Sequence, residues 1–375
     1  MRHLLKIFCL LSLVAGSLHA APAATKLWTT NVYFSLISSI RFNPSGNALA
    51  SGSYSGPARL WSVTNAILIR TFTIPQNDVV AAAFSRDGIR LFGGGGSGGY
   101  RAWRVSDGAV FFGDIGPGSG YGQAAYSPNG LYLAKGRTGV LTLNHADSGE
   151  GITFLGDEPH ESVLAVEFSP DSTLLGSSGA NDTAKLWRVS DGELLQTFPY
   201  GAIAFTPDGK YFCYDNHDGT AIFWDVQTNG IARIFPAWGS AVRFTANGQI
   251  LVTVNGPLIN LWRVATGALL ASYDTAPDGT ARSLDVSPDA RLFAYGTYSG
   301  TVVLARMPVT LDTITRTGNE TILHWQGGSG LYQLQSNPNF TTNGWQNLGT
   351  PTTNTVATNV STTTLFFRVQ SLPNP

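Results

Sequence analysis

Hydrophobic and polar positions recur along this chain with a period of about 40 residues. Seven times a short apolar run ends and a polar turn of the Ser-Pro-Asp-Gly type follows. The residues that end these runs are Phe42, Phe84, Tyr126, Phe168, Phe205, Phe244 and Val286. Their spacing varies only between 37 and 42 residues. Because chance does not maintain a period over seven copies, the pattern predicts a chain built from seven similar units.

Each copy continues with two more alternating runs, and the second of these usually ends in tryptophan. The tryptophans are Trp61, Trp103, Trp187, Trp224 and Trp262, while Asn144 and Ala305 occupy the same position in the third and seventh copies. A polar turn and a last apolar run complete the copy. Four short strands with turns between them fit into this length, and no segment shows the 3.6-residue period of a helix. The sequence therefore predicts an all-β protein.

These copies resemble WD repeats over about residues 25–308, and Trp224-Asp225 is a literal Trp-Asp pair. The resemblance implies a seven-bladed β-propeller, whose radial arrangement protects the sheet edges. It also implies hydrogen-bonded positions within the blades. The residues of this chain that match them are His160, Ser177, Trp187, Asp218 and Trp224. Since most copies lack the full set, we expect these residues to be structural and the blades to be stabilised mainly by strand burial.

The seventh copy ends early, at Met307-Pro308, and lacks an outer strand. The segment 26–31 precedes the first copy and has the composition of a strand. We therefore expect it to pair with the seventh blade and close the ring, as the WD-repeat resemblance also implies. After about Pro308 the period stops. Residues 311–375 contain short alternating strands and resemble a small fibronectin-type-III-like β-sandwich of secreted bacterial proteins.

The first residues have the plan of a secretory signal peptide. Arg2 and Lys6 form a basic start, an apolar run follows, and Ala20 ends it, which predicts a signal peptide over residues 1–20. We expect a secreted or periplasmic protein from a bacterial source, with no membrane span after cleavage. The formal net charge is −1, without basic clusters, which argues against nucleic acid binding. Cys213 lies in an apolar run and is interpreted as a buried, inert thiol.

No set of residues predicts catalysis, a metal site or a cofactor. The glycine run 93–99 lacks the Lys-Ser/Thr pair of a phosphate-binding loop. Asp215 and Asp218 lack the alternating oxygen ligands of a calcium loop. The acidic residues beside His160 are typical of a solvated loop. The sequence therefore favours a protein that binds and is not an enzyme.

Aromatic residues in the loops and inner turns of a propeller gather around one mouth of its channel, where they can anchor a partner. The candidates are Trp238, Tyr54, Tyr100, Tyr121, Tyr200, His217 and Tyr298. The first hypothesis is a monomeric interaction scaffold with an unknown protein partner. The alternative is a carbohydrate-binding propeller, recognised by exposed aromatics beside acidic or amide groups. A propeller hydrolase or lyase is the third hypothesis and would need His160 and His217 close together around a carboxylate.

Overall fold

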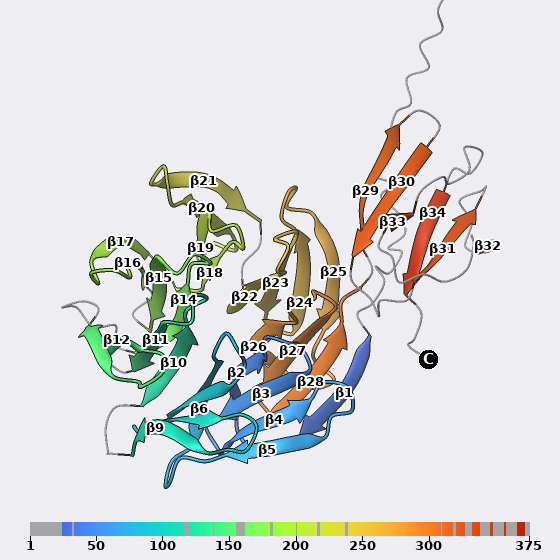
Figure 1. Ribbon diagram of the computed structural model, residues 1–375. Coiled ribbons are helices and arrows are strands. Elements are labelled where there is room, and N and C mark those ends of the chain that lie inside the picture. Colours follow the sequence, from blue (N-terminus) through green and yellow to red (C-terminus); the bar gives the residue numbers. More distant parts are fainter. Residues whose placement is uncertain are drawn as a thin grey trace, which may run out of the picture.

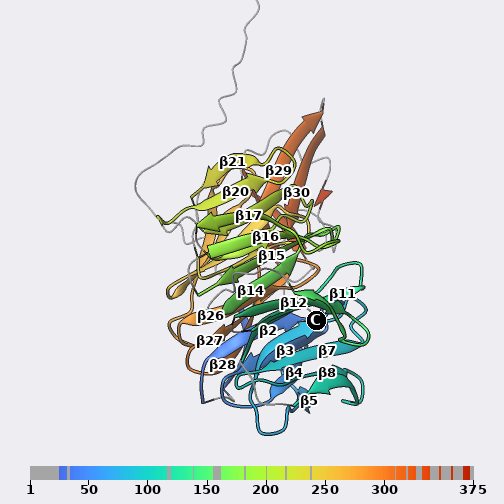
Figure 2. The ribbon, with the colours of Figure 1, turned by 90° about the vertical axis from the view of Figure 1, so that its left-hand side faces the viewer.

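The structure is a computed structural model, and it describes most of the chain between residues 25 and 371. The described ranges are 25–31, 34–115, 120–137, 139–154, 162–180, 183–199, 201–215, 218–236, 239–308, 310–317, 320–326, 332–337, 346–347, 356–357 and 366–371. Within them every regular element is a strand. Seven antiparallel four-stranded sheets follow one another as the blades of a β-propeller (Figure 1 and Figure 2).

Each of the first four blades is a run of four consecutive strands. Blade 1 consists of β2 (Ile37–Phe42), β3 (Ala48–Ser53), β4 (Ala58–Ser62) and β5 (Leu68–Phe72), and blade 2 of β6 (Val79–Phe84), β7 (Arg90–Gly95), β8 (Tyr100–Arg104) and β9 (Val110–Asp114). Blade 3 consists of β10 (Tyr121–Tyr126), β11 (Tyr132–Arg137), β12 (Val140–His145) and β13 (Gly151–Phe154), and blade 4 of β14 (Val163–Phe168), β15 (Leu174–Gly179), β16 (Thr183–Arg188) and β17 (Leu194–Pro199).

The remaining three blades repeat this arrangement, and the last recruits its outer strand from the start of the chain. Blade 5 consists of β18 (Ile203–Phe205), β19 (Tyr211–Asp215), β20 (Ala221–Asp225) and β21 (Gly230–Phe235), and blade 6 of β22 (Ala241–Phe244), β23 (Ile250–Asn255), β24 (Leu258–Arg263) and β25 (Leu269–Asp274). Blade 7 consists of β26 (Ala281–Val286), β27 (Leu292–Thr297), β28 (Thr301–Arg306) and β1 (Lys26–Asn31). The predicted seven-bladed propeller is confirmed.

The recurring polar turn joins the first and second strands of each blade. In blade 5 the Thr206 hydroxyl donates to Asp208 Oδ1 at 2.6 Å and accepts from the Tyr211 amide at 3.0 Å. Gly209 then adopts a φ of +69°, where glycine has no steric penalty. In blade 7 Ala290 stands at the equivalent position with a φ of +58°. The Ser/Thr-Pro-Asp-Gly motif is therefore a hydrogen-bonded reversal that returns the chain along its own sheet.

The core lies between neighbouring blades. Between blades 4 and 5, for example, the Phe198 and Phe212 rings are 5.3 Å apart, and the Phe205 and Phe212 rings are 5.1 Å apart. All three side chains are buried. The repeated tryptophans add to these layers, and the indole nitrogens of three of them donate to a hydroxyl of the adjacent strand. These pairs are Trp61 with Ser51, Trp187 with Ser177 and Trp262 with Thr253. Apolar burial thus accounts for most of the packing, as expected from the sequence.

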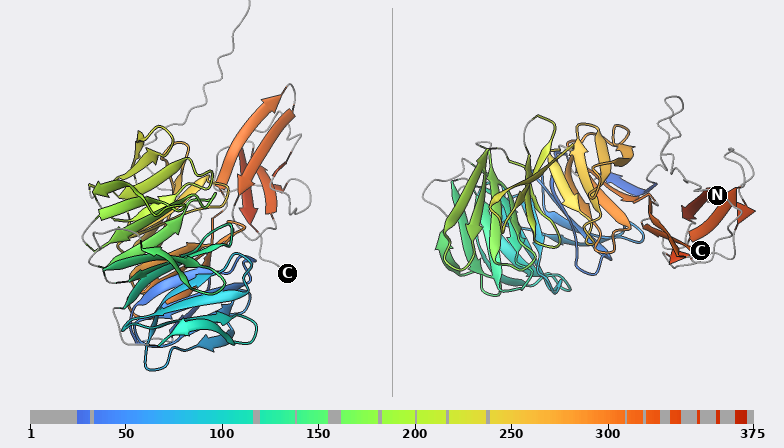
Figure 3. Two further views of the ribbon diagram at one scale, coloured as in Figure 1. Left: turned by 60° about the vertical axis from the view of Figure 1, so that its left-hand side comes forward. Right: turned by 90° about the horizontal axis from the view of Figure 1, so that it is seen from above.

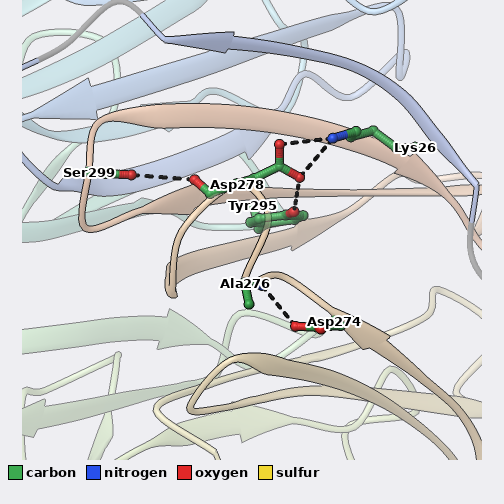
Figure 4. A network of polar contacts seen from close by, with 6 residues as sticks. All are labelled: Lys26, Asp274, Ala276, Asp278, Tyr295 and Ser299. Atoms are coloured by element: carbon green, nitrogen blue, oxygen red, sulfur yellow. Dashed lines mark hydrogen bonds and ion pairs between the residues drawn. The ribbon is translucent and has the colours of Figure 1, made fainter.

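The predicted closing strand is β1. It pairs antiparallel with β28, so that Lys26 lies opposite Ala305 and Asn31 opposite Thr301. At its start the Lys26 ammonium binds Asp278 Oδ1 at 2.9 Å, and the buried Tyr295 hydroxyl donates to Asp278 Oδ2 at 3.1 Å (Figure 4). This contact raises the pKa of Lys26 above its ordinary value. The two ends of the propeller are thereby joined by a strand pair and an ion pair.

After blade 7 the chain forms two small antiparallel sheets, drawn in orange and red in Figure 3. One contains β29 (Thr310–Thr317), β30 (Glu320–Gln326) and β33 (Val356–Ala357). The other contains β31 (Tyr332–Asn337), β32 (Gln346–Asn347) and β34 (Phe366–Ser371). The region is therefore all-β, and its assignment as a fibronectin-type-III-like sandwich stays a prediction.

Candidate functional site

The first strands of the blades touch one another around the ring and line a central channel. The upper face of the propeller is defined as the face that carries the loops between blades and the turns between second and third strands. The lower face carries the Ser-Pro-Asp-Gly turns. The upper cavity of the channel has a volume of about 390 Å³ and the lower cavity about 430 Å³. Arg41, Val166, Glu167 and Arg243 line both cavities and so form the boundary between them.

Four charged side chains, which we call the channel quartet, come from one repeat position. Arg41, Glu167, Arg243 and Asp285 each immediately precede the residue that ends the first strand of blades 1, 4, 6 and 7. In the other three blades this position is Ala83, Ala125 and Ala204. The alanines of blades 2 and 3 line the lower cavity, where their small side chains leave space opposite the charged groups.

The acidic members of the quartet bind across blade boundaries. Arg243 Nε lies 3.4 Å from Asp285 Oδ1, and the Phe42 amide donates to Asp285 Oδ2 at 2.8 Å. In the same way the Phe205 amide donates to Glu167 Oε1 at 3.2 Å. These contacts join blade 6 to blade 7, blade 7 to blade 1, and blade 4 to blade 5. The quartet therefore stabilises the ring at its narrowest radius.

Burial in the channel shifts the pKa values of two members of the quartet, Arg41 and Glu167. Desolvation and the neighbouring positive charge of Arg243 lower the pKa of Arg41 to about 10. Burial raises the pKa of Glu167 above its ordinary value, although Arg243 opposes this shift. Both directions arise because charged forms lose hydration inside the ring. The channel is thus a polar site with guanidinium and carboxyl groups close together.

Three exposed aromatic side chains lie on the upper face of blades 1 and 7, and we call them the aromatic patch. Phe34, in the link from β1 to β2, is fully exposed, and its amide donates to Ser55 Oγ at 3.2 Å. Tyr54 is 50% exposed in the β3–β4 turn, and Tyr298 is 54% exposed in the β27–β28 turn. Tyr298 also lines the upper cavity. Through Tyr298 the patch reaches the mouth of the channel.

The other predicted site residues divide into those that the structure describes and those that it does not. Trp238, Tyr200, His217 and His160 lie outside the described residues, and of Tyr121 only the backbone in β10 is described. Among the predicted structural residues, the Trp187 indole binds Ser177 Oγ at 2.8 Å, and Asp218 Oδ1 accepts from the Thr220 amide at 2.9 Å. Trp224 packs edge-on against Phe198, with ring centroids 5.2 Å apart.

Tyr100 is packed between blades 2 and 3 and is not an exposed anchor. Its ring stacks on Phe92 at 5.7 Å, and Lys135 Nζ lies 4.1 Å from the ring centroid. Lys135 is itself buried, and desolvation lowers its pKa to about 8. The cation–π contact compensates only part of the cost of burying this charge. Tyr100 therefore serves the interface between the blades.

This buried lysine predicts a specific pH dependence. The pKa of Lys135 is about 8 in the folded chain, against 10.5 for an ordinary lysine. Between these values the unfolded chain binds more protons, so the free energy of unfolding rises with pH. We expect the Lys135→Met variant to lack this rise. From neutral pH to about pH 10, the wild type should gain about 2 kcal/mol relative to the variant, measured by urea unfolding. Parallel curves for the two proteins would contradict the assignment.

The prediction for Cys213 is confirmed, because this thiol is buried in β19 and burial raises its pKa well above the ordinary value. Among the described residues, no group of three or more His, Cys, Asp or Glu side chains could hold a metal ion. No helix in the described part of the chain is long and apolar enough to cross a membrane.

Sequence reasoning missed the channel quartet and Phe34. A signal for the quartet was present in the sequence, since its members share one repeat position that is alanine in the other three copies. The exposure of Phe34 has no such signal, because it depends on where the link between β1 and β2 crosses the upper face.

The chain is similar to WD-repeat proteins. A family model described as "WD domain, G-beta repeat" matches residues 26–62 and 153–188. An uncharacterized WD repeat-containing protein of Synechocystis sp. is 25% identical over 178 residues, which are 45% of this chain and 51% of that protein. WD repeat-containing protein 1 of Rattus norvegicus is 26% identical over 238 residues, 57% of this chain and 37% of that protein. Transcription initiation factor TFIID subunit 5 of Caenorhabditis elegans is 26% identical over 166 residues, 42% of this chain and 26% of that protein.

The chain thus spans about half or less of the length of these relatives. WD repeats are present, and they form a seven-bladed propeller without a helix in the described residues. Propellers of this kind are typically non-catalytic scaffolds that bind protein partners.

Proposed function

We propose that this protein is a secreted, non-catalytic binding scaffold whose upper face contacts a protein partner. The observation that carries the proposal is the aromatic patch at the mouth of the channel. Large aromatic side chains supply much of the binding energy at protein interfaces, and exposing them to water has a cost that a partner would remove. Phe34, Tyr54 and Tyr298 lie on adjacent blades that strand β1 holds together.

Other parts of the proposal rest on the sequence. The basic start, apolar run and Ala20 of residues 1–20 support secretion or a periplasmic location, in a bacterial source. Residues 311–375 form a separate fibronectin-type-III-like sandwich beside the propeller of residues 25–308. The chain acts as a monomer that needs no cofactor.

The test compares partner capture by the wild type and by a variant without the patch. Immobilised residues 25–375 are exposed to native extracellular protein, beside a Phe34→Ala, Tyr54→Ala, Tyr298→Ala triple variant. We expect proteins captured by the wild type to be lost from the variant, with affinity reduced at least about tenfold. The matched control is Ile89→Ala with Leu131→Ala, two exposed aliphatic residues in lower-face turns. Equal capture by all three proteins would exclude the upper face as the binding surface.

A carbohydrate ligand is the second candidate. Tyr298 of blade 7, Gln123 of blade 3 and Asp215 of blade 5 all line the upper cavity, so an aromatic ring, an amide and a carboxylate face one pocket. This combination suits a ligand that offers hydroxyl groups and a flat face. A glycan panel probed with the wild type and with Tyr298→Ala tests it, because a sugar that stacks on this ring should lose most of its binding to the variant.

A further inference from the structure

We propose that the upper cavity of the channel is a binding site for a small hydroxylated carboxylic acid, such as a uronic acid. This inference goes beyond the protein-binding role of the aromatic patch, and it rests on the second candidate function, which it narrows from a carbohydrate in the upper cavity to an acidic one. It would take a ligand with a carboxylate at one end and hydroxyl groups at the other.

The positive side of the cavity comes from blades 1 and 7. Arg41 and Arg282 both line it. Among the described residues, the Arg41 guanidinium donates a hydrogen bond only to its neighbour's carbonyl, Ile40 O, at 2.7 Å. Whereas Arg243 is neutralised by Asp285, neither Arg41 nor Arg282 forms an ion pair within the described part of the chain. Guanidinium groups bind carboxylates through paired, charge-assisted hydrogen bonds.

The opposite side of the cavity carries an unsatisfied donor. Ser178, in β15 of blade 4, is 1% exposed and lines the same cavity, and its Oγ has no hydrogen-bond partner among the residues that the structure describes. A buried hydroxyl without a partner is costly, and most such groups in folded proteins are paired. Rotation of the Ser178 side chain would turn the hydroxyl toward the cavity, where a ligand would supply the missing partner.

The carboxylates of the cavity define what the ligand carries besides its acid group. Glu167 and Asp215 line the cavity together with the arginines. They would repel a second acid group, but they accept hydrogen bonds from hydroxyls. The volume of about 390 Å³ lies at the small end of the range for small-molecule sites. Mixed charges and hydroxyls around a space of this size therefore fit an acidic sugar better than a simple dianion.

The experiment measures binding of D-glucuronate by isothermal titration calorimetry, with D-glucose as a control in which a neutral hydroxymethyl group replaces the carboxylate. We expect glucuronate to bind and glucose to bind at least about tenfold more weakly. Arg41→Gln and Arg282→Gln should each weaken glucuronate at least about tenfold. Arg104→Gln changes an exposed arginine at the end of β8; it is the matched control and should leave binding unchanged.

Ser178→Ala separates a ligand site from a structural role. Because its hydroxyl is buried and unpaired, its removal should raise the melting temperature of the free protein while it weakens glucuronate about threefold or more. Should Arg41→Gln fail to fold, Arg282→Gln and Ser178→Ala still decide the question.

Equal binding of glucuronate and glucose, or binding of neither, would overturn the proposal. Binding of a capped peptide, Gly-Gly-Glu-Gly-Gly, and of the same peptide with glutamine in place of glutamate is measured in the same way. If the glutamate peptide binds through Arg41 while glucuronate does not, the cavity receives an acidic side chain of a protein and the hydroxy-acid proposal is wrong. Either failure leaves capture through the aromatic patch untouched, because that surface is tested by other variants.

Discussion

A chain that starts at residue 32 should be less stable than a chain that starts at residue 25 by about 4 kcal/mol or more. The shorter chain lacks β1, and with it the strand pair to β28 and the contact of Trp28, whose indole donates to Val63 O at 3.0 Å. Trp28 also packs against a buried cluster that contains Val302 and Leu304. Removing a large aromatic side chain from such a site alone costs several kcal/mol. Urea unfolding followed by tryptophan fluorescence measures the difference.

One further variant shows which part of β1 matters. Lys26→Met in the longer chain removes the ion pair with Asp278 but keeps the strand, and we expect a loss of only about 1 kcal/mol because the lysine is largely exposed. The shorter chain should also aggregate more readily, since its β28 presents an unpaired edge. If the chains starting at residues 25 and 32 unfold at the same urea concentration, the ring is not closed by this strand.

Trp187→Ala should lower the free energy of unfolding by about 3–5 kcal/mol. The Trp187 side chain is 1% exposed, packs in the cluster between blades 3 and 4, and donates its indole hydrogen to Ser177 Oγ at 2.8 Å. Truncation leaves a cavity and removes the hydrogen bond to Ser177 Oγ. Thermal and urea unfolding of the wild type and the variant measure the loss.

Trp224→Ala is the matched comparison, because Trp224 holds the same repeat position but is only half-buried. The position that holds Ser177 in blade 4 holds Tyr214 in blade 5. We expect a loss of about 2 kcal/mol for this variant. Equal losses for the two substitutions would mean that the repeat position, and not burial and hydrogen bonding in each blade, determines the cost.

Much of the fold could be predicted because the repeat encodes local structure. The residue that ends each first strand, such as Phe205, is followed by a turn whose side chains bond to its own backbone. The tryptophans stand one residue before the ends of the third strands, as at Trp187 and Trp224. Segment 26–31 was predicted to close the ring because the seventh copy lacked an outer strand, and β1 occupies these residues.

The candidate site was less predictable, since it depends on contacts between blades that the repeat does not specify. The position of Arg41 in its repeat does not predict that it lies near Arg243, which is far away in the sequence but close in the channel. Tyr54 and Tyr100 both lie where the second strand of a blade turns into the third, in adjacent blades. Yet Tyr100 packs on Phe92, whereas Tyr54 is exposed. Which aromatic ring becomes accessible is decided by the neighbouring blade, and this information lies outside any single copy.

The pairing of β1 with β28 also places a condition on biosynthesis. Lys26 leaves the ribosome early, whereas its partner Ala305 is made much later. At about 5–20 residues per second, the interval is roughly 15 to 60 seconds. During that time β1 has no sheet to join, and its Trp28 side chain has no packing partner in blade 7. The nascent chain can assemble its blades one after another, but the circle becomes complete only after nearly all of the propeller has been translated.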